Sequence, residues 1–399
     1  MKTVAVIFGG RSAEHDVSII TAHIPIIDSL LASGEFEVWP VYITKEGKWY
    51  ADQKMNDLSY FKQPDYEERL AREKQVQLSF DDGLSLVWRS AGWQMFSKSV
   101  KIDIAFPAMH GTYGEDGSLM GLLRMAGVPF AGCDIFASAI AMDKVLTKQI
   151  IAAEGMPVVP YTWFTRRQWD NERDTVREKI AKLGFPLFVK PVHLGSSIGI
   201  AKAADQTQLL QVIEVALHYD EKVLVEKSVE NLVEVTLPIM GNDEPRLALP
   251  ERPLNKTDFF NFEDKYLSGG GKKGGKSQAI GGQKGANSQY SEIPAKIGEG
   301  VTKRVMELGA SVYKTLGCAG IARVDFLIDS DTDTIYVNEV NTLPGSLYHH
   351  NWKAAGVSNM ELVTSLIRLA EERHAAQRAT THTFRSDILQ KVGGPKTQK

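Results

Sequence analysis

The chain has 399 residues, of which 43% are hydrophobic and 24% charged, and its net charge at pH 7 is -3. This is the balance of a globular protein, and at about 150 residues per domain the length predicts two or three domains. So small a net charge favours neither nucleic acid nor an anionic membrane as a partner. The two cysteines, Cys133 and Cys318, are few for a secreted protein, so we expect a cytoplasmic location.

The apolar run at residues 4–8 predicts a buried strand of a parallel sheet, which ends in a glycine turn at Gly9 and Gly10. It is too short for a signal peptide, and no uninterrupted apolar run reaches the roughly 18 residues of a membrane span. A helical pattern continues through Leu31, whereas residues 51–100 give no clear pattern. Further strands are predicted at residues 36–43, 102–107 and 128–131. The first third is therefore predicted to be a βαβ-type domain.

A helix is predicted at residues 135–154, followed by a small α+β unit and then a third region. The predicted strands of the small unit are 185–191, 198–203 and 222–228, with a helix at 206–218. The third region is predicted to contain strands at 235–240, 319–328 and 334–340 and helices at 298–316 and 360–373. Gly317 suits the left-handed end of the first of these helices, and the turn at 329–333 predicts a hairpin. Residues 376–399 read as a polar tail.

Residues 268–289 are dominated by glycine, lysine and small polar side chains, so we predict a mobile loop there, at residues 267–290. Gly270, Gly275, Lys276 and Ser277 match the Walker A phosphate-binding pattern. That pattern indicates a nucleotide site only between a buried strand and a helix, and neither flanks it here. We therefore interpret the match as a product of composition.

The predicted hairpin carries a cluster of polar side chains among apolar ones: Arg323, Asp325, Glu339 and Asn341. Glu339 and Asn341 are two residues apart and share one face of the sheet, and Asp325 lies roughly opposite on the partner strand. Carboxylate and amide oxygens are ligands that suit Mg²⁺, and a bridging carboxylate can hold two such ions for phosphoryl transfer. The alternative is a surface hairpin with solvated acids.

A phosphate site is indicated by Lys190 at the end of one strand and by the small-residue turn at 195–199. Backbone N–H groups of a glycine turn can bind phosphate, and a lysine adds a positive charge. A plain hairpin explains the turn equally well. Lys144 lies on a predicted helix, where a surface lysine is usual. Glu14 and His110 each follow a strand, where ligands bind in open α/β sheets, although each also has a structural explanation.

Several short motifs occur in order along the chain and carry a more specific signal together than any of them does alone. They are Gly9-Gly10-Arg11-Ser12-Ala13-Glu14-His15, His110-Gly111-Thr112-Tyr113-Gly114-Glu115-Asp116-Gly117, Met142-Asp143-Lys144, Val189-Lys190-Pro191, Gly195-Ser196-Ser197, Glu263-Asp264-Lys265-Tyr266, Arg323-Val324-Asp325-Phe326 and Asn338-Glu339-Val340-Asn341-Thr342-Leu343-Pro344-Gly345. Over about residues 3–375 the sequence resembles the D-alanine–D-alanine ligases of the ATP-grasp superfamily.

The resemblance implies an α/β fold (α+β ATP-grasp), in which an N-terminal Rossmann-like α/β domain precedes two ATP-grasp subdomains with antiparallel sheets. We expect the N-terminal domain at residues 1–134, the central subdomain at 135–229, the catalytic subdomain at 230–375 and the tail at 376–399. It also implies ATP, two Mg²⁺ ions with Mn²⁺ as a substitute, amino-acid substrates, no nucleic acid or membrane partner, and the homodimer usual in the family.

Residue roles are carried over from the family motif by motif. The residues expected to bind ATP are Lys144, Lys190, Ser197, Glu226, Lys227, Val229, Glu234 and Lys265, with Glu226 at the adenine edge and Glu234 at the ribose. Metal ligands are expected at Asp325, Glu339 and Asn341. The catalytic residues are expected to be Glu14, Ser196, Tyr266 and Arg323. The substrate residues are expected to be His110, Gly345, Ser346 and His350.

The implied reaction activates the first carboxylate as an acyl phosphate, which the amine of the second substrate then attacks beside Arg323. The product would be a D-alanyl-D-alanine-type dipeptide for peptidoglycan precursor synthesis. By counting, His350 falls where the family has a serine that binds the second carboxylate. D-serine, D-lactate or another amino acid therefore remains open as second substrate. A non-catalytic nucleotide-binding paralogue is a further alternative, although such a protein needs neither Arg323 nor two metal ions.

Overall fold

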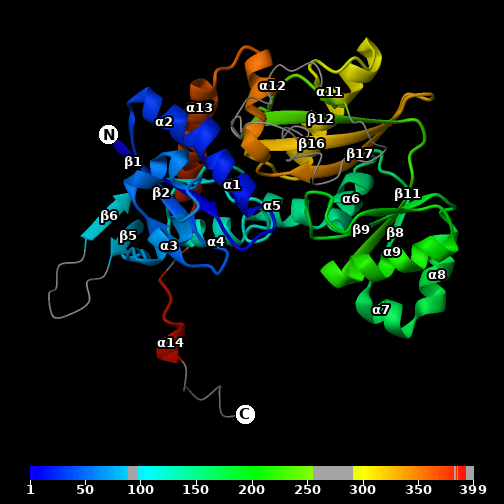
Figure 1. Cartoon of the computed structure of the whole chain (residues 1–399), viewed down its shortest axis with the longest axis horizontal. Helices are drawn as coiled ribbons and strands as arrows, with labels where there is room; N and C mark the ends of the chain where they lie inside the picture. The colour runs from blue at the N-terminus through cyan, green and yellow to red at the C-terminus, as the bar shows by residue number, and fades with distance from the viewer. Residues whose placement is uncertain (89–97, 255–290, 382, 384, 392–399) are drawn as a thin grey trace.

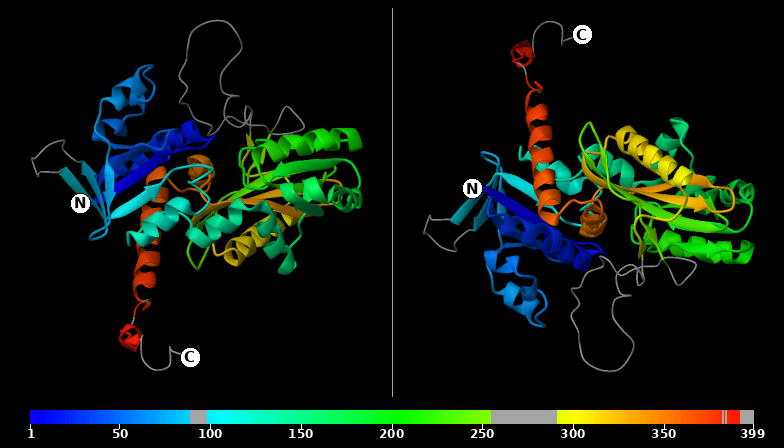
Figure 2. Two further views of the ribbon diagram at one scale, coloured as in Figure 1. Left: turned by 90° about the horizontal axis from the view of Figure 1, so that it is seen from below. Right: turned by 90° about the horizontal axis from the view of Figure 1, so that it is seen from above.

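The computed structural model describes residues 1–88, 98–254, 291–381, 383 and 385–391. Three regions, each with its own main sheet, are visible in Figure 1. In the two further views of Figure 2, most of the N-terminal region lies to the left of the long C-terminal helix, and the sheets of the other two regions lie to its right. The division of the chain at residues 134 and 229 stays a prediction.

The N-terminal region is built on a four-stranded sheet. Its strands are β1 (Lys2–Gly9), β2 (Phe36–Ile43), β3 (Trp49–Ala51) and β7 (Ile104–Pro107). Their order is β3-β2-β1-β7, and β1 is parallel to both β2 and β7, as the apolar run predicts. The predicted strand at 128–131 was wrong: only a single bridge joins Phe130 to Ala105, because the segment leaves the sheet after one pairing.

Helices and one further sheet complete this region. The helical segments are α1 (His15–Thr21), the π-helical Ala22–Ile27, α2 (Asp28–Ser33), α3 (Tyr66–Ala71) and α4 (Ser118–Met125), with short 3₁₀ turns at Gln53–Asn56 and Leu58–Tyr60. Residues 51–100, which gave no clear pattern, include a meander of three antiparallel strands. They are β4 (Gln77–Ser79), β5 (Leu84–Trp88) and β6 (Lys98–Ile102).

The stretch His15–Ser33 is long and apolar enough to cross a membrane by length and composition, with a mean hydropathy of 1.3 and 61% of its window buried. It is made of α1, the π-helical turn and α2, so the predicted helical pattern through Leu31 is confirmed. Its apolar residues pack into the core of the N-terminal region. Such burial is typical of a core helix and makes this weak evidence for a membrane span.

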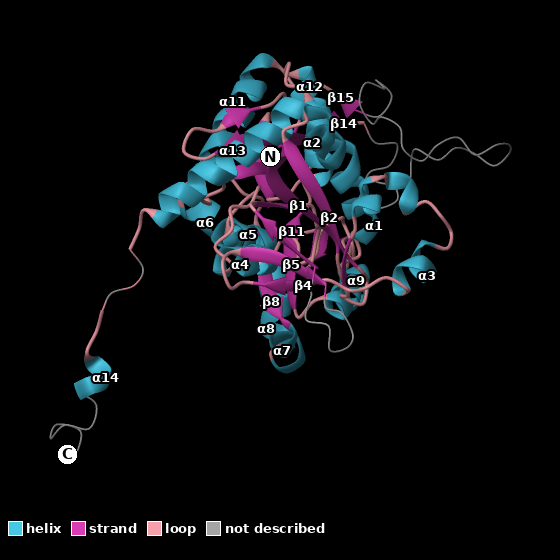
Figure 3. Ribbon diagram, turned by 90° about the vertical axis from the view of Figure 1, so that its left-hand side faces the viewer, coloured by secondary structure: helices cyan, strands magenta, loops and turns pink. Residues whose placement is uncertain are grey.

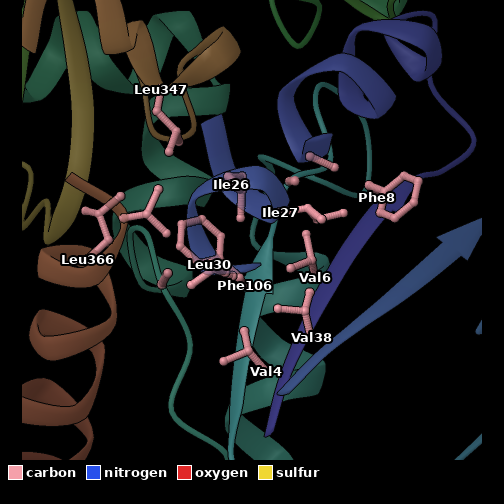
Figure 4. Close-up of a cluster of buried hydrophobic side chains, with 14 of the residues drawn as sticks. Val4, Val6, Phe8, Ile26, Ile27, Leu30, Val38, Phe106, Leu347 and Leu366 are labelled. Carbon is pink, nitrogen blue, oxygen red and sulfur yellow. The ribbon is translucent and has the colours of Figure 1, made fainter. Parts of the chain in front are cut away.

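Alternate residues of β1 enter two different cores. Val4 and Val6 belong to one buried cluster and Ala5 and Ile7 to another, as in a strand covered on both faces. Figure 4 shows the first cluster, to which Leu366 contributes from the distant C-terminal helix. The N-terminal sheet thus shares a buried core with the C-terminal helix.

The central region is an antiparallel sheet with order β10-β9-β11-β8. Its strands are β8 (Tyr161–Thr165), β9 (Leu187–Pro191), β10 (Ala201–Ala203) and β11 (Lys222–Lys227). Its helices are α7 (Arg166–Asn171), α8 (Arg173–Ala181) and α9 (Gln206–Tyr219). The predicted strand at 198–203 begins only at Ala201, since residues 195–200 form consecutive turns.

The helix predicted at 135–154 is in fact two helices, α5 (Ile135–Met142) and α6 (Lys144–Ala153). Asp143 separates them because its backbone is extended, with ψ of 100°. Its side chain accepts hydrogen bonds from the N–H groups of Val145 and Leu146, and so caps α6. The break places Lys144 in the first turn of a helix that begins beside the central sheet.

The C-terminal region has an antiparallel sheet with order β13-β12-β16-β17. Its strands are β12 (Leu232–Gly241), β13 (Arg246–Leu247), β16 (Gly320–Asp329) and β17 (Thr334–Asn341), and β14 (Arg252–Pro253) pairs with β15 (Ser291–Glu292) beside it. Its helices are α11 (Glu299–Thr315), α12 (His349–Ala354) and α13 (Asn359–Arg378). The hairpin and the left-handed Gly317, with φ of 65°, are confirmed. The short helix α14 (Ile388–Lys391) stands apart from the three sheets in Figure 3.

Candidate active site

The hairpin of β16 and β17 brings the predicted oxygen ligands together. Asp325 is in register with Glu339, and Arg323 with Asn341. The amide of Asn341 donates a 3.2 Å hydrogen bond to Oδ2 of Asp325. A bulge directly after Asp325 shifts the register there and lets side chains of both strands converge. The three predicted ligands thus form one cluster on the hairpin.

The donor set of this cluster suits a hard divalent cation. Asp325 and Glu339 supply carboxylates, and Asn341 supplies an amide oxygen. Within the described ranges, no group of three or more His, Cys, Asp and Glu side chains is placed to hold a metal. The cluster has only two carboxylates and no nitrogen or sulfur ligand, which excludes a structural zinc site of the usual kind. The residues therefore fit Mg²⁺.

Arg323 is held rigidly in this cluster. Its Nε and Nη2 donate to the two oxygens of Asp325 at 2.6 and 2.5 Å, and its guanidinium carbon lies 4.7 Å from the centre of the Tyr348 ring. A forked contact on one side and a ring on the other fix the plane of the guanidinium. The arrangement can stabilise negative charge that develops next to it without prior reorganisation.

Two predicted lysines approach the hairpin from the central region. Nζ of Lys144 donates to the carbonyl of Leu194 at 2.6 Å and lies 3.8 Å from Oε2 of Glu339. Nζ of Lys190 lies 3.3 Å from the side-chain oxygen of Asn338 on β17. Both lysines are less than one-tenth exposed, so Lys144 is not the surface lysine that its place on a helix would suggest. Their charges face the carboxylates of the hairpin.

The carboxylate of Glu226 lies between two buried lysines. Its oxygens are 2.6 Å from Nζ of Lys148 and 2.5 Å from Nζ of Lys190. Burial alone would raise the pKa of Glu226, but the two ammonium groups outweigh it and lower the pKa to about 2. Burial lowers the pKa of Lys148. Burial also acts to lower the pKa of Lys190, but Glu226, followed by Glu339 and Glu234, outweighs it and raises that pKa above its ordinary value.

Lys148 was missed by sequence reasoning, although a signal was present. It lies four residues after Lys144, which places both side chains on one face of α6. Both oxygens of the Glu226 carboxylate contact the two lysines. A contact between Glu226 and the edge of an adenine ring would therefore have to use the backbone atoms of Glu226. The other predicted ATP residues continue from this strand: Lys227 ends β11, Val229 follows it, and Glu234 lies on β12.

A second charged cluster holds the loop that follows β9. The backbone N–H of His193 donates to Oδ2 of Asp220 at 2.7 Å, and its ring lies 3.0 Å from the same carboxylate and 3.3 Å from Oδ2 of Asp143. Lys222 also contacts Asp143, at 2.7 Å. Hydrogen bonds to Asp143 and Asp220 raise the pKa of His193 to about 9. The protonated ring thus ties this loop to the start of α6.

The hydrogen bonds from the protonated His193 ring to Asp143 and Asp220 form a clamp, which we predict is lost at high pH. The pKa of His193 rises on folding from the ordinary value of 6.5 to about 9. Its contribution to the free energy of unfolding is therefore complete below pH 6.5 and disappears as the pH rises through about 9. The melting-temperature difference between wild type and His193→Asn should be larger at pH 6 than at pH 10. An equal difference at both values would contradict the clamp.

Glu14 reaches from the N-terminal region to the small-residue turn of the central region. The hydroxyl of Ser196 donates to Oε1 of Glu14. A Cβ added to Gly111 would lie 2.9 Å from Oε2 of Glu14, and one added to Gly195 would lie 3.4 Å from it. The two glycines thus leave room for the carboxylate. Ser196 and Ser197 have φ of 54° and 60°, left-handed values that aim the turn toward Glu14.

His110 and Glu115 line the same place from the loop after β7. Nε2 of His110 lies 2.8 Å from the hydroxyl of Thr21, and Glu115 accepts a 2.6 Å hydrogen bond from the N–H of Gly111. Burial raises the pKa of Glu115, the charge of Glu14 adds to it, and the value reaches about 8. Glu115 belongs to the motif at residues 110–117, but nothing in the sequence indicated that its side chain would be buried.

The predicted substrate residues after β17 lie in a left-handed turn. Gly345 begins it, and Ser346 donates its backbone N–H to the hydroxyl of Thr21 at 2.9 Å. His350 lies one turn further, with Nε2 2.9 Å from Oε2 of Glu251. Glu251 was not predicted, and it gives His350 a carboxylate partner in the protein itself.

Some predictions fall outside the described residues. They are Lys265, Tyr266, the Walker A-like segment and the loop at 267–290. The roles of all predicted site residues stay predictions. What the structure adds is their placement: Glu14 and His110 from the first region, Lys144, Lys190 and Ser196 from the second, and the hairpin of the third meet in one place.

An α/β region followed by two antiparallel sheets, with lysines of one facing an acidic hairpin of the other, defines an ATP-grasp ligase. Two family models match the chain: "D-ala D-ala ligase N-terminus" over residues 3–133 and "D-ala D-ala ligase C-terminus" over residues 150–368. The chain belongs to the D-alanine–D-alanine ligase family, whose members are ATP-dependent ligases. The predicted family and fold are confirmed.

Relatives match over nearly the whole chain. D-alanine–D-alanine ligase of Chloroherpeton thalassium is 35% identical over 384 residues, which covers 94% of this chain and 98% of that protein. The ligase of the same name from Deinococcus radiodurans is 36% identical over 379 residues, covering 93% and 99%. Among solved structures, the D-alanine-D-alanine ligase of Coxiella burnetii matches with a TM-score of 0.75 and 26% identity, covering 95% and 96%. The VanG D-Ala:D-Ser ligase of Enterococcus faecalis gives 0.74 and 31%, covering 92% and 99%.

Proposed function

We propose that the protein joins two D-alanine molecules with ATP through an acyl phosphate, in the synthesis of peptidoglycan precursors. The chain is an ATP-dependent ligase of this family. The observation that carries the proposal is the convergence of Arg323, Asp325, Glu339 and Asn341 with Lys144 of α6. A protein that only bound nucleotide would need no guanidinium fixed beside such a cluster.

In the proposed reaction the residues of the chain position the substrates, neutralise the charge of the phosphates and stabilise the oxyanion. Lys144 and Lys190 neutralise the phosphates of ATP while the first carboxylate attacks the γ-phosphate. Glu14, with Ser196, holds the ammonium group of the first amino acid. The amine of the second amino acid then attacks the acyl carbon, and Arg323 stabilises the oxyanion that forms. The first attack releases ADP. In the second step the carbon–nitrogen bond forms in the tetrahedral intermediate, and phosphate leaves when that intermediate collapses and the nitrogen loses its proton.

The remaining predicted residues complete this proposal. ATP would also contact Ser197, Glu226, Lys227, Val229, Glu234 and Lys265. Tyr266 would join Glu14 and Ser196, and His110, Gly345, Ser346 and His350 would contact the amino acids. Asp325, Glu339 and Asn341 would hold two Mg²⁺ ions, with Mn²⁺ as a substitute. When bound, these ions supply positive charge to the transferring phosphoryl group. We further propose a cytoplasmic homodimer with no nucleic-acid or membrane partner.

Product identification tests the function most directly. The full-length protein is incubated with ATP, Mg²⁺ and mixed D- and L-amino acids, and the products are identified by mass spectrometry. We expect D-alanyl-D-alanine and stoichiometric phosphate release with D-alanine alone. Because a D-Ala:D-Ser ligase is among the similar structures, D-serine and D-lactate belong in the panel. Absence of product with every pair would refute the ligase and favour a binding protein.

We predict that His350 contacts the second substrate. Its ring lies 5.2 Å from that of Tyr348, which packs under Arg323. Replacing His350 by alanine should therefore raise the KM of the second amino acid far more than that of ATP. Steady-state kinetics with each substrate varied in turn measures this. Equal effects on both KM values would contradict the contact.

A further inference from the structure

One buried threonine joins the two segments that we expect to contact the amino acids. Thr21 is the last residue of α1 and has no exposed surface. Its hydroxyl lies 2.8 Å from Nε2 of His110 and accepts a 2.9 Å hydrogen bond from the backbone N–H of Ser346. His110 follows β7 of the first region, and Ser346 follows β17 of the third. A single side chain therefore contacts both segments.

The Thr21 hydroxyl has a single proton and accepts from the N–H of Ser346. Burial, the largest influence, lowers the pKa of His110, which favours the neutral ring with one N–H. With that N–H on Nδ1, Nε2 can accept the hydroxyl proton of Thr21 across 2.8 Å, and the hydroxyl then serves as both donor and acceptor.

The same hydroxyl secures a strained turn. Ser346, Leu347 and Tyr348 have φ of 49°, 52° and 48°, left-handed values that residues other than glycine rarely adopt. Such a conformation persists where surrounding contacts enforce it. Thr21 binds the first of the three, and Leu347 is buried in the core shown in Figure 4. The turn ends with the Tyr348 ring 4.7 Å from the guanidinium carbon of Arg323.

We propose that Thr21 is a positioning residue of the ligase: it holds His110 as the Nδ1–H tautomer and fixes the turn that places Ser346 and Tyr348. The proposal rests on the proposed function, in which these segments contact amino acids. It implies that Nε2 of His110 is not available to take a proton from substrate, because it accepts the hydroxyl proton of Thr21. His110 then shapes the site through its ring and does not act as a base.

Two substitutions separate the hydroxyl from the volume of the side chain. Thr21→Val is nearly isosteric but removes both the donor and the acceptor, and Thr21→Ser keeps both. With Thr21→Val we expect the kcat/KM of the amino acids to fall about tenfold or more, while the KM of ATP stays within about twofold. Thr21→Ser should retain nearly wild-type kinetics. Equal kinetics in Thr21→Val and wild type would overturn the proposal.

The tautomer is tested independently of turnover by ¹⁵N nuclear magnetic resonance of the histidine rings in the full-length protein. There are nine histidines, so a His110→Gln variant identifies the signal. We expect the neutral ring of His110 to be Nδ1–H in wild type and in Thr21→Ser. An Nε2–H signal in the wild type would overturn the proposal, even if Thr21→Val failed to fold. Failure to form any dipeptide would instead refute the proposed function and leave the tautomer result standing.

Discussion

Replacing Arg323 by methionine is expected to lower kcat for dipeptide formation by about 10²–10³-fold, the usual cost of removing a fixed group that stabilises an oxyanion. The guanidinium is held by both oxygens of Asp325 and by the Tyr348 ring, so it is in place before charge develops. Methionine keeps most of the length of the side chain without its charge. The KM of ATP should change far less than kcat.

Two measurements on this variant separate the steps of the reaction. Dipeptide formation is followed by mass spectrometry, and formation of the acyl phosphate by positional isotope exchange in ATP in the presence of D-alanine. We expect exchange to persist in Arg323→Met while dipeptide formation is lost. Arg323→Lys keeps the positive charge but loses the two parallel hydrogen bonds to Asp325. Its kcat for dipeptide formation should therefore lie between those of wild type and Arg323→Met. Arg304→Met is the matched control, since Arg304 is 61% exposed on α11. Equal loss of both steps would refute a role confined to the second.

The hairpin could be predicted from the sequence because its signals are local. Its strands are joined by a short turn, and the two-residue period alone places Glu339 and Asn341 on one face. The small-residue turn next to Lys190 was visible for the same reason. Its contact with Glu14 was not visible from spacing, because the two segments lie 182 positions apart. Only the family resemblance named Ser196 and Glu14 together, as two of the catalytic residues.

What remained hidden depends on tertiary packing. Thr21 and Ser346 are 325 residues apart, and nothing near Thr21 marks its hydroxyl as shared between two segments. Lys148 appeared to be an ordinary helical lysine until β11 brought Glu226 against it. The break between α5 and α6 was missed because Asp143 is a tolerable helix residue, and its role as a cap depends on the extended backbone that the central region imposes.

Replacing Glu226 by glutamine is expected to lower the free energy of unfolding by about 3–5 kcal/mol. The substitution leaves Lys148 and Lys190 as two buried ammonium groups without the carboxylate that now separates them. Urea denaturation followed by tryptophan fluorescence measures the loss. The matched control is Glu307→Gln, because the Glu307 side chain is 52% exposed and its ion pair is worth at most about 1 kcal/mol.

A double-mutant cycle identifies the cause of that loss. If repulsion between the two lysines causes it, adding Lys148→Met to Glu226→Gln removes one of the charges and should restore part of the stability. ATP, whose phosphates we expect Lys190 to bind, should raise the melting temperature of Glu226→Gln more than that of wild type, because the nucleotide then replaces the missing negative charge. Additive effects of the two substitutions, together with equal stabilisation by ATP, would show that Glu226 does not hold Lys190 ready for phosphate.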